Sequence, residues 1–458
     1  MSCKSNTKKL RLEVIEKQEI VSEINKDLDK SVTMDTLIRQ GVKYTEHRSV
    51  DRENPAVTLN FPYDKMPVKN FDLANYYSQI QYIKIKYPYP EGCFLNEAVL
   101  NNTGEKLNSQ VYLTSNNIIA GDYYMGFHCY DLSGNFMYTI AAMDKLPDYN
   151  RKKNKLVMDN NQLAKKVVNF SVYGNTCMIT TEGNNKYLQY FYDLSANKTI
   201  LRRPDYPVVS RANTISPAML ISPQSYVLYT YDTFIKPGSE LMESFDVKGD
   251  SLCIFKNYNS FLQRQRKRLS FSETPSLYYY NGLLTLRQEY NDTVYRVKSP
   301  FELVPAYIID FEKQKLSIDS AFYGDKTGKL MQKKLIETGK FLLVVNCENE
   351  DNYNNRQNGK VQFLYSVYDK GNNIHYKINN EIFPEDYWIS NSVKDGIPVY
   401  MNTVKSDGKK MYAGYTKARL ESLINNKNFS SFSKEQQDKI KLLYNELTND
   451  EMIVMILE

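Results

Sequence analysis

The sequence predicts an all-β protein whose four-stranded sheets are repeated around an axis as a β-propeller. Two observations carry this prediction. The first is composition, because 38 of the 458 residues are tyrosine and 13% are aromatic. Aromatic side chains favour the half-buried surface of a pleated sheet. The second is a recurring pattern in which an aromatic residue at a strand end is followed directly by an acidic residue.

The aromatic-acid pattern occurs at five places along the chain. They are Tyr130-Asp131, Tyr192-Asp193, Phe245-Asp246, Phe311-Glu312 and Tyr368-Asp369. The aromatic positions lie 62, 53, 66 and 57 residues apart, which suits a four-stranded blade with long connections. An acid at a turn accepts backbone N–H bonds, so we expect a turn role for all five. With strands before residue 107 and after residue 396, the sequence predicts six blades, with seven as the alternative.

The first repeat shows the strand pattern most clearly. Ile83, Ile85 and Tyr87 alternate with lysines, as in a half-buried strand. Short strands are expected at 111–114, 118–122, 127–131 and 135–140, with turn residues between them. Four short strands joined in this way form a meander, the folding unit of a propeller blade.

The C-terminal region departs from the repeat. Residues 417–424 and 434–447 are expected to be helices, the second with a capping box between Ser433 and Gln436. The apolar segment 451–458 is expected to be a strand. We expect it to pair with residues 80–87 and so close the ring.

The N-terminal region is predicted to stand apart from the propeller. Residues 8–30 read as a polar helix with one narrow apolar stripe, which packs on the body or binds a partner helix. Residues 45–60 read as a linker. This divides the chain into a tether, helix and linker at 1–60 and a propeller at 61–458, which includes the C-terminal helices and the closing strand.

Charge gives little indication of a nucleic-acid partner. Fifty-nine basic and 53 acidic residues give a net charge of +6, which is small for this length. The densest basic cluster comprises Arg264, Arg266, Lys267 and Arg268. A solvated loop is the expected role of this cluster, and contact with an anionic ligand is the alternative. No nucleic-acid binding is therefore predicted.

The six cysteines are scattered and form no C-x-x-C pair. Cys3 differs from the others, because it follows a small residue and precedes a polar run. This is similar to the end of a bacterial lipoprotein signal, although the apolar region of such a signal is not in the sequence. We therefore predict lipidation of Cys3, with the lipid as the only contact to a membrane.

Three segments resemble a known family. They are Asp122 with Tyr130–Phe136, Glu289–Val297 with Leu303–Asp310, and Leu442–Val454. Together they resemble the TolB-like six-bladed β-propeller lipoproteins of Bacteroidetes over residues 55–458. The third segment lacks the proline that the family usually carries. The resemblance implies a lipid-anchored protein of the bacterial cell envelope, on its periplasmic or its surface side, and implies no particular activity.

The sequence offers few catalytic groups. Its three histidines are far apart, and the nucleophile elbow and phosphate-binding glycine patterns are absent. No metal and no cofactor are predicted. Four residues are candidates for ligand binding: Tyr387 and Trp388 as an aromatic platform, and Arg287 and Glu289 facing the central channel. Core packing of Trp388 and surface pairing of Arg287 with Glu289 are the alternatives.

We therefore predict a cell-envelope lipoprotein whose propeller binds an unknown protein, peptide or carbohydrate. Recognition by loops on a rigid scaffold is the expected mechanism. The alternative is a hydrolase or lyase with its site at the mouth of the propeller channel.

Overall fold

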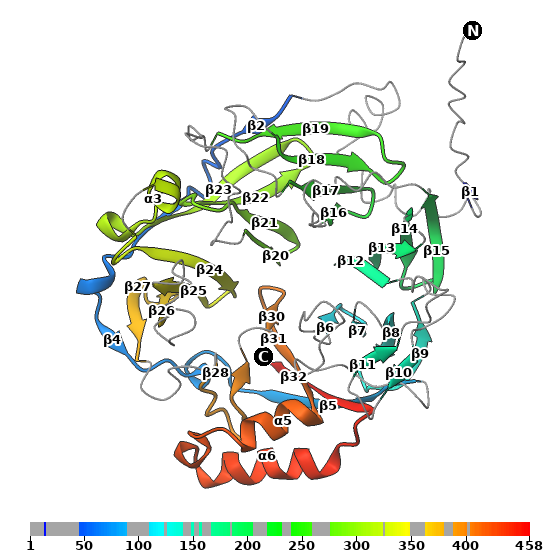
Figure 1. Cartoon of the computed structure of the whole chain (residues 1–458), viewed down its shortest axis with the longest axis vertical. Coiled ribbons are helices and arrows are strands. Elements are labelled where there is room, and N and C mark those ends of the chain that lie inside the picture. The colour runs from blue at the N-terminus through cyan, green and yellow to red at the C-terminus, as the bar shows by residue number, and fades with distance from the viewer. Residues whose placement is uncertain are drawn as a thin grey trace.

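The computed structural model of the chain shows six four-stranded sheets arranged around one axis (Figure 1). It describes residues 13–14, 45–88, 110–122, 126–140, 148–150, 155–157, 166–183, 186–204, 218–230, 240–258, 275–323, 326–348, 362–379, 388–400 and 404–458. The fold is a six-bladed β-propeller, as predicted, and the alternative of seven blades does not apply.

Each blade is an antiparallel sheet whose first strand is nearest the axis. Blade 1 holds β6 (Gln110–Leu113), β7 (Asn117–Asp122), β8 (Gly126–Asp131) and β9 (Phe136–Thr139). Blade 2 holds β12 (Lys166–Tyr173), β13 (Thr176–Gly183), β14 (Lys186–Asp193) and β15 (Lys198–Pro204). Blade 3 holds β16 (Ala218–Ser222), β17 (Ser225–Tyr229), β18 (Glu240–Asp246) and β19 (Ser251–Lys256).

The remaining blades complete the circle. Blade 4 holds β20 (Ser276–Tyr280), β21 (Leu283–Arg287), β22 (Thr293–Ser299) and β23 (Glu302–Asp310). Blade 5 holds β24 (Leu330–Glu337), β25 (Phe341–Glu348), β26 (Gln362–Asp369) and β27 (Ile374–Ile378). Blade 6 holds β30 (Lys405–Ser406), β31 (Met411–Thr416), β32 (Glu451–Leu457) and β5 (Ile80–Lys86). Smaller elements in the connections are β10 (Asp148–Asn150), β11 (Lys155–Val157), β28 (Trp388–Ile389), β29 (Val399–Tyr400), α3 (Ile318–Tyr323) and the short 3-10 turns at Tyr63–Lys65, Leu73–Asn75, Glu312–Gln314 and Phe429–Ser431.

Blade 6 closes the ring with strands from both ends of the described chain. β32 lies between β31 and β5, and its register places Val454 opposite Gly414 on one side and Ile83 on the other. The predicted pairing of the last strand with residues 80–87 is confirmed. Every residue of β32 except Glu451 is buried, which accounts for its continuous apolar sequence.

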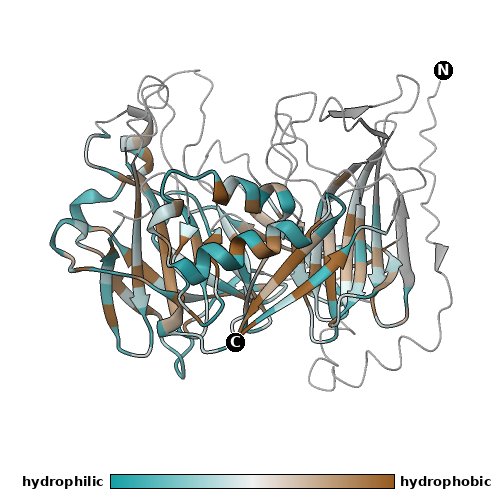
Figure 2. Ribbon diagram, turned by 90° about the horizontal axis from the view of Figure 1, so that it is seen from below, coloured by the Kyte–Doolittle hydropathy of each residue, from teal (hydrophilic) through white to brown (hydrophobic). Residues whose placement is uncertain are grey.

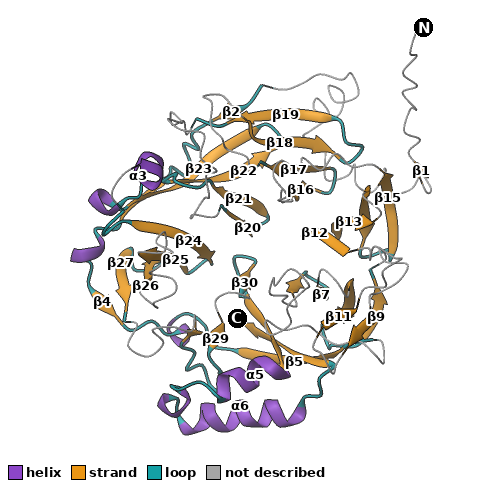
Figure 3. Ribbon diagram, viewed as in Figure 1, coloured by secondary structure: helices purple, strands orange, loops and turns teal. Residues whose placement is uncertain are grey.

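Two helices connect β31 to β32 along the outside of blade 6 (Figure 3). α5 spans Lys417–Ile424 and α6 spans Lys434–Glu446, which confirms both predicted helices. Ser433 and Gln436 form the predicted capping box. Apolar and polar residues alternate along both helices (Figure 2), and α6 buries Ile440 and Leu443. None of the described helices is long and apolar enough to span a bilayer.

Residues 45–79 form an N-terminal rim segment along the outer edges of blades 4 and 5 (Figure 1). β2 (His47–Arg48) and β3 (Val57–Asn60) pair in parallel with β23, and β4 (Val68–Lys69) pairs in parallel with β27. The stretch 45–60, predicted as a linker, thus covers sheet edges that would otherwise be open. Residues 52–55 are exposed, which explains why the composition there is typical of a linker.

The predicted N-terminal helix at 8–30 lies outside the described residues, apart from two positions. Glu13–Val14 form β1, which pairs antiparallel with β15 of blade 2. A helix over these two residues is therefore wrong. Strand pairing satisfies their backbone groups through the edge of another blade instead of through a local helical turn.

The core lies mainly between neighbouring blades, where large side chains pack face to face. Phe127 of blade 1 stacks on Phe170 of blade 2 with ring centroids 3.8 Å apart. Tyr226 stacks on Phe245 at 5.3 Å within blade 3. Tyr130, Tyr226, Tyr229 and Tyr415 are completely buried. The tyrosine excess therefore has a largely structural origin.

Four of the five aromatic-acid pairs form the predicted turn between the third and fourth strands of a blade. Asp193 accepts N–H bonds from Ser195 and Ala196 at 2.8 and 3.1 Å, and Asp131, Asp246 and Asp369 act in the same way. Phe311-Glu312 is the exception, because it follows the fourth strand of blade 4. There Asp310 accepts the bond from the Glu312 N–H at 2.7 Å. The third strand of blade 4 ends at Ser299, before Pro300, so this blade lacks the motif.

Candidate functional site

The innermost strands of five blades each carry one partly exposed residue that is a tyrosine or a lysine. We call these side chains the axial cluster: Tyr112 of β6, Tyr173 of β12, Tyr279 of β20, Lys334 of β24 and Lys405 of β30. All five are neither fully buried nor fully exposed. Contacts join Tyr173 to Tyr279 and Lys405 to Tyr112, which are far apart in sequence.

Neutral hydrogen bonds join Tyr279 of blade 4 to the innermost strands of blades 2 and 3. The Tyr279 hydroxyl lies 2.7 Å from the Ser171 hydroxyl and donates to the Leu220 carbonyl at 2.8 Å. The ring of Tyr173 meets the ring of Tyr279 edge-on, with centroids 6.1 Å apart. Burial raises the pKa of Tyr279, so its hydroxyl stays protonated. These contacts join blades 2, 3 and 4 near their innermost strands.

The other half of the axis carries two lysines. The Lys405 ammonium lies 3.3 Å from the centroid of the Tyr112 ring, a close cation–π contact. Burial lowers the pKa of Lys405 well below its usual value, and the charge of Lys334 lowers it further. Burial likewise lowers the pKa of Lys334 to about 8. Within the described part of the chain, no carboxylate forms an ion pair with Lys405.

A β-bulge in β24 orients Lys334. Gln332 is opposite Asn346, but Lys334 is opposite Val345, so one extra residue lies between the two pairs. Because successive side chains point to opposite faces, the extra residue puts Lys334 on the face of Val345. Val345 packs in the cluster that contains Met411 and Tyr415 of blade 6. The bulge therefore turns Lys334 toward the blade that carries Lys405.

Three residues further along β24, Glu337 has a complete set of partners. Its carboxylate accepts hydrogen bonds from Arg296 at 2.6 and 2.8 Å and from Lys370 at 2.9 Å. The hydroxyls of Tyr278 and Tyr307 donate to it at 2.8 and 2.7 Å. Burial raises the pKa of Glu337, but Arg296 and Lys370 outweigh burial and hold the pKa below its usual value. The group joins blade 4 to blade 5 and is structural.

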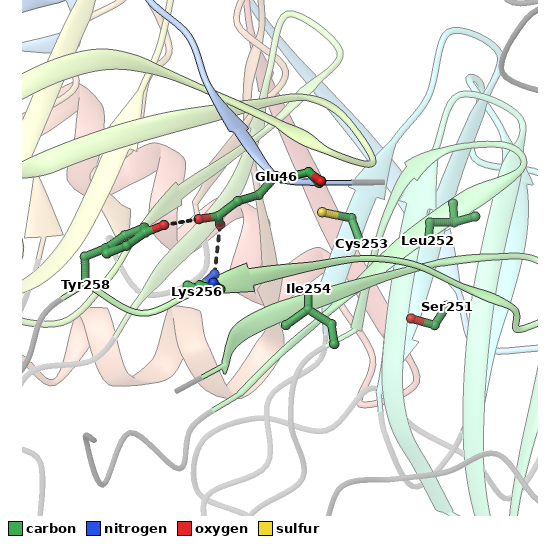
Figure 4. Close-up of a pocket in the computed structure, with 8 residues that line it drawn as sticks. Glu46, Ser251, Leu252, Cys253, Ile254, Lys256 and Tyr258 are labelled. Carbon is green, nitrogen blue, oxygen red and sulfur yellow. Dashed lines mark hydrogen bonds between the residues drawn. The ribbon is translucent and has the colours of Figure 1, made fainter. Parts of the chain in front are cut away.

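A cavity of about 330 Å³ lies at the outer edge of blade 3 (Figure 4). It is lined by Thr45, Glu46, Ser251, Leu252, Cys253, Ile254, Lys256 and Tyr258. Glu46 accepts the Lys256 N–H at 2.8 Å and the Tyr258 hydroxyl, and Arg48 donates to the Lys256 carbonyl at 2.7 Å. Side chains of the rim segment thus form hydrogen bonds with the backbone groups at the end of the edge strand β19. Burial raises the pKa of Cys253 to about 11, which leaves its thiol protonated and unreactive.

The ligand-binding residues predicted from sequence lie elsewhere. Arg287 and Glu289 are 3% and 4% exposed, and the Tyr229 hydroxyl of blade 3 donates to Glu289 at 2.5 Å. Both side chains are buried, so surface pairing across a hairpin does not describe them. Trp388 is 8% exposed and packs on Tyr400 at 5.0 Å. Tyr387 and Cys3 lie outside the described residues, as does the basic cluster at 264–268.

Sequence reasoning missed the two axial lysines. A lysine in a short strand is ordinarily a solvated residue on the exposed face. Lys405 follows Val404 and precedes a turn, and nothing local distinguishes it from the other lysines. The feature that could have identified these lysines is their position, because both lie in the first strand of a blade. That position can be recognised only when the boundaries of the repeats are known.

The fold is that of a six-bladed propeller. Among the described residues, no group of three or more His, Cys, Asp or Glu side chains is placed to hold a metal ion. The chain belongs to the family described as "Domain of unknown function (DUF4933)", whose model matches residues 39–426. No curated protein matches the chain.

Solved structures support the fold. The chain is similar to a "Putative exported protein" from Bacteroides fragilis NCTC 9343, with 14% identity, a TM-score of 0.51 and coverage of 88% of this chain and 99% of that one. BamB from Moraxella catarrhalis (8% identity, TM-score 0.25) covers 54% of this chain and 56% of its own. The Swd1 propeller domain of Myceliophteria thermophila (9% identity, TM-score 0.31) covers 76% and 98%. The last two likenesses are too weak to carry an argument.

Proposed function

We propose that the protein is an exported binding module of the cell envelope that holds its ligand at the propeller axis. The observation that carries this proposal is the axial cluster, whose partly exposed side chains make contacts between blades 2 and 4 and between blades 1 and 6. The innermost strands that carry these side chains belong to hydrogen-bonded sheets, so the site is preorganised. Preorganisation lowers the entropy that a ligand must lose on binding.

Two further observations support an envelope location. The Bacteroides fragilis protein of the same fold is named as exported, and it aligns over nearly its full length. In this chain Cys3 lies in the sequence context of a lipidated cysteine. We propose that this cysteine anchors the propeller to a membrane through acyl chains. TolB-like membership remains part of this proposal.

Binding fits the axial chemistry better than catalysis does. Glycoside hydrolysis needs two carboxyl groups facing the substrate, and the axial cluster contains none. The nearby Glu337 carboxylate already accepts bonds from two cations and two hydroxyls. The tyrosine hydroxyls of the cluster have raised pKa values where a shift is resolved, and so are poor bases.

The binding proposal is tested with axial variants. Candidate oligosaccharides and peptides are first screened by the rise in melting temperature of the wild-type chain. Tyr112→Ala and Tyr279→Ala are expected to weaken the best ligand at least about tenfold in calorimetry, because each removes axial contact area. Tyr258→Ala, at the outer edge of blade 3, is the matched control and should leave affinity unchanged. Affinity lost only in the control variant would place the site off the axis.

The tether is tested separately. Cys3→Ala, in the protein expressed with its native signal region, is expected to move the chain from the membrane fraction to the soluble fraction. A Ser2→Ala variant keeps the cysteine and serves as the control. Unchanged membrane association of Cys3→Ala refutes the lipid anchor without touching the binding proposal.

A further inference from the structure

The outermost strand of blade 3 has an edge that is uncovered within the described part of the chain. β19 pairs with β18 on one side, and no described strand pairs with its other side. The outermost strands of blades 2, 4 and 5 differ, because β1 pairs with β15, β2 and β3 pair with β23, and β4 pairs with β27. An uncovered edge presents backbone N–H and C=O groups to a further strand. β19 is therefore a candidate position for strand addition.

Side chains of the rim segment show which backbone groups of β19 point outward. Glu46 accepts the Lys256 N–H at 2.8 Å (Figure 4), and Arg48 donates to the Lys256 carbonyl at 2.7 Å. The backbone groups of an antiparallel strand alternate in direction, and β19 has no extra residue between Cys253 and Lys256. The N–H and C=O groups of Ile254 therefore point away from β18, as those of Lys256 do.

The cavity at the outer edge of blade 3 is lined by the same strand. Its volume of about 330 Å³ is near the lower limit of about 300 Å³ for ligand pockets, which suits a side chain better than a large molecule. Leu252 and Ile254 give it an apolar lining, and Ile254 is 38% exposed. The Ser251 hydroxyl is buried and has no hydrogen-bond partner among the described residues. An edge strand beside a cavity offers backbone pairing for affinity and a pocket for selectivity.

Strand pairing at the outer edges of this propeller indicates what kind of partner fits β19. β2 pairs with β23 from His47 onward, directly after Glu46, which lines the cavity. β3 continues along β23, and each of these additions is a short extended segment held by backbone bonds. A partner that continues this arrangement onto β19 is an extended peptide, because its alternating N–H and C=O groups complement those of Ile254.

We infer that the outer edge of β19 is a peptide-docking site, in which an extended segment of a partner protein pairs with Ile254 and places an apolar side chain in the cavity. Glu46 and Arg48 already bind the backbone of Lys256, so the segment extends from Ile254 toward Ser251. The site is separate from the axial cluster, because β19 is the outermost strand of its blade and the axial side chains belong to innermost strands. It goes beyond the proposed axial function and does not depend on it.

Peptide selection on the full chain tests this inference. A display library of short random peptides is panned on wild type, and the selected peptides are synthesised and titrated by fluorescence anisotropy. Ile254→Lys places a charge beside the cavity, and Ile254→Pro removes the outward N–H. An edge strand tolerates proline where the N–H faces solvent, so the proline variant is expected to fold. We expect each variant to bind the selected peptides at least about tenfold more weakly than wild type.

Ile308→Lys is the matched control. Ile308 lies in β23, the outermost strand of blade 4, and is also 38% exposed. The edge of β23 is already occupied at this point, because Ile308 is opposite Thr58 of β3. Peptide affinity is expected to be the same in this variant as in wild type. Melting temperatures close to that of wild type show that a variant is folded, and either Ile254 variant is sufficient for the test.

Changes to the peptide backbone show whether the peptide pairs as a strand. Methylation of each amide nitrogen in turn removes one N–H and leaves the side chains unchanged. We expect at least one methylated peptide to lose its binding, and full affinity of all of them overturns the inference.

Two further outcomes also overturn it. One is a panning experiment that enriches no peptide on the full chain. The other is a set of selected peptides that bind both Ile254 variants as tightly as wild type. Peptides that are lost in Tyr112→Ala, and not in the Ile254 variants, bind at the axis, which supports the proposed function and removes the docking site on β19.

Discussion

Glu337 of β24 and Lys405 of β30 show two ways of placing a charge inside a propeller. Glu337 is 2% exposed and has two cations and two hydroxyls as partners. Lys405 packs on the Tyr112 ring, and the charge of Lys334 lowers its pKa. Opposite charges compensate the buried carboxylate, whereas the second charge has a like charge nearby. The comparison teaches that partner groups, and not burial alone, separate a structural charge from a candidate binding charge.

The physical basis of this contrast is desolvation. A buried ion is tolerated when hydrogen bonds and opposite charges replace the water it has lost. Arg296 meets Glu337 with both terminal nitrogens and also lies 4.5 Å above the Tyr280 ring. Lys405 has the ring of Tyr112 but no carboxylate among the described residues. Lys405 is therefore expected to lower the stability of the fold, and the Glu337 group to maintain it.

The largest effect is expected at Glu337. Glu337→Ala leaves Arg296 and Lys370 without their shared anion, so we expect the free energy of unfolding to fall by about 3–5 kcal/mol. Urea unfolding followed by tyrosine fluorescence measures the change. Glu312→Ala, at an exposed position, is the control and should stay within about 0.5 kcal/mol. A loss below about 1 kcal/mol at Glu337 would show that the network is not needed between blades 4 and 5.

The opposite sign is expected at the axis. Lys405→Met keeps an apolar stem and removes a poorly solvated charge. We expect it to raise the free energy of unfolding by about 1–3 kcal/mol at pH 7. The same urea experiment applies, with Lys434→Met on the exposed face of α6 as the control. Destabilisation by Lys405→Met would mean that this lysine is already compensated within the fold, and the contrast with Glu337 would disappear.

The smallest effect is a pH dependence. The folded pKa of Lys334 is about 8, below its ordinary value of 10.5, so the unfolded chain binds more protons between these values. The free energy of unfolding therefore rises as the pH increases from about 8 to about 10.5. Lys334 contributes at most about 1.4 kcal/mol of this rise per pH unit. Lys405 contributes in the same direction. The difference in free energy of unfolding between wild type and the variant that combines Lys334→Met with Lys405→Met should shrink over this pH range. A difference that stays constant with pH would contradict this prediction.

The elements that sequence predicted correctly are those with strong local signals. Ser433 and Gln436 define the start of α6, because a capping box uses residues three positions apart. The continuous apolar run of β32 marks a strand buried on both faces, and only an early strand remained to pair with it. The turn aspartates also have a local signal, since Asp193 accepts hydrogen bonds from backbone groups two and three residues away.

What sequence did not predict depends on partners far away in the chain. The rim segment pairs with β23 and β27, which lie more than 200 residues later in the chain. The composition of the segment gives no indication of this pairing. Glu289 was expected at the channel, but its partner is Tyr229 of the neighbouring blade. Lys334 faces blade 6 only because of an extra residue opposite β25. Bulges and contacts between blades have no period that a single sequence reveals.

The position of β32 also sets the order in which the molecule can assemble. β32 is an inner member of its sheet, between β31 and β5, and joins residues 451–457 to residues 80–86. During synthesis β5 leaves the ribosome early and waits for more than 360 residues before its partner strand exists. Contacts this distant slow folding, since a large loop must close before they form. The ring is therefore a late product of biosynthesis, and a ribosome-bound chain lacking its last residues has five potential blades and an open seam.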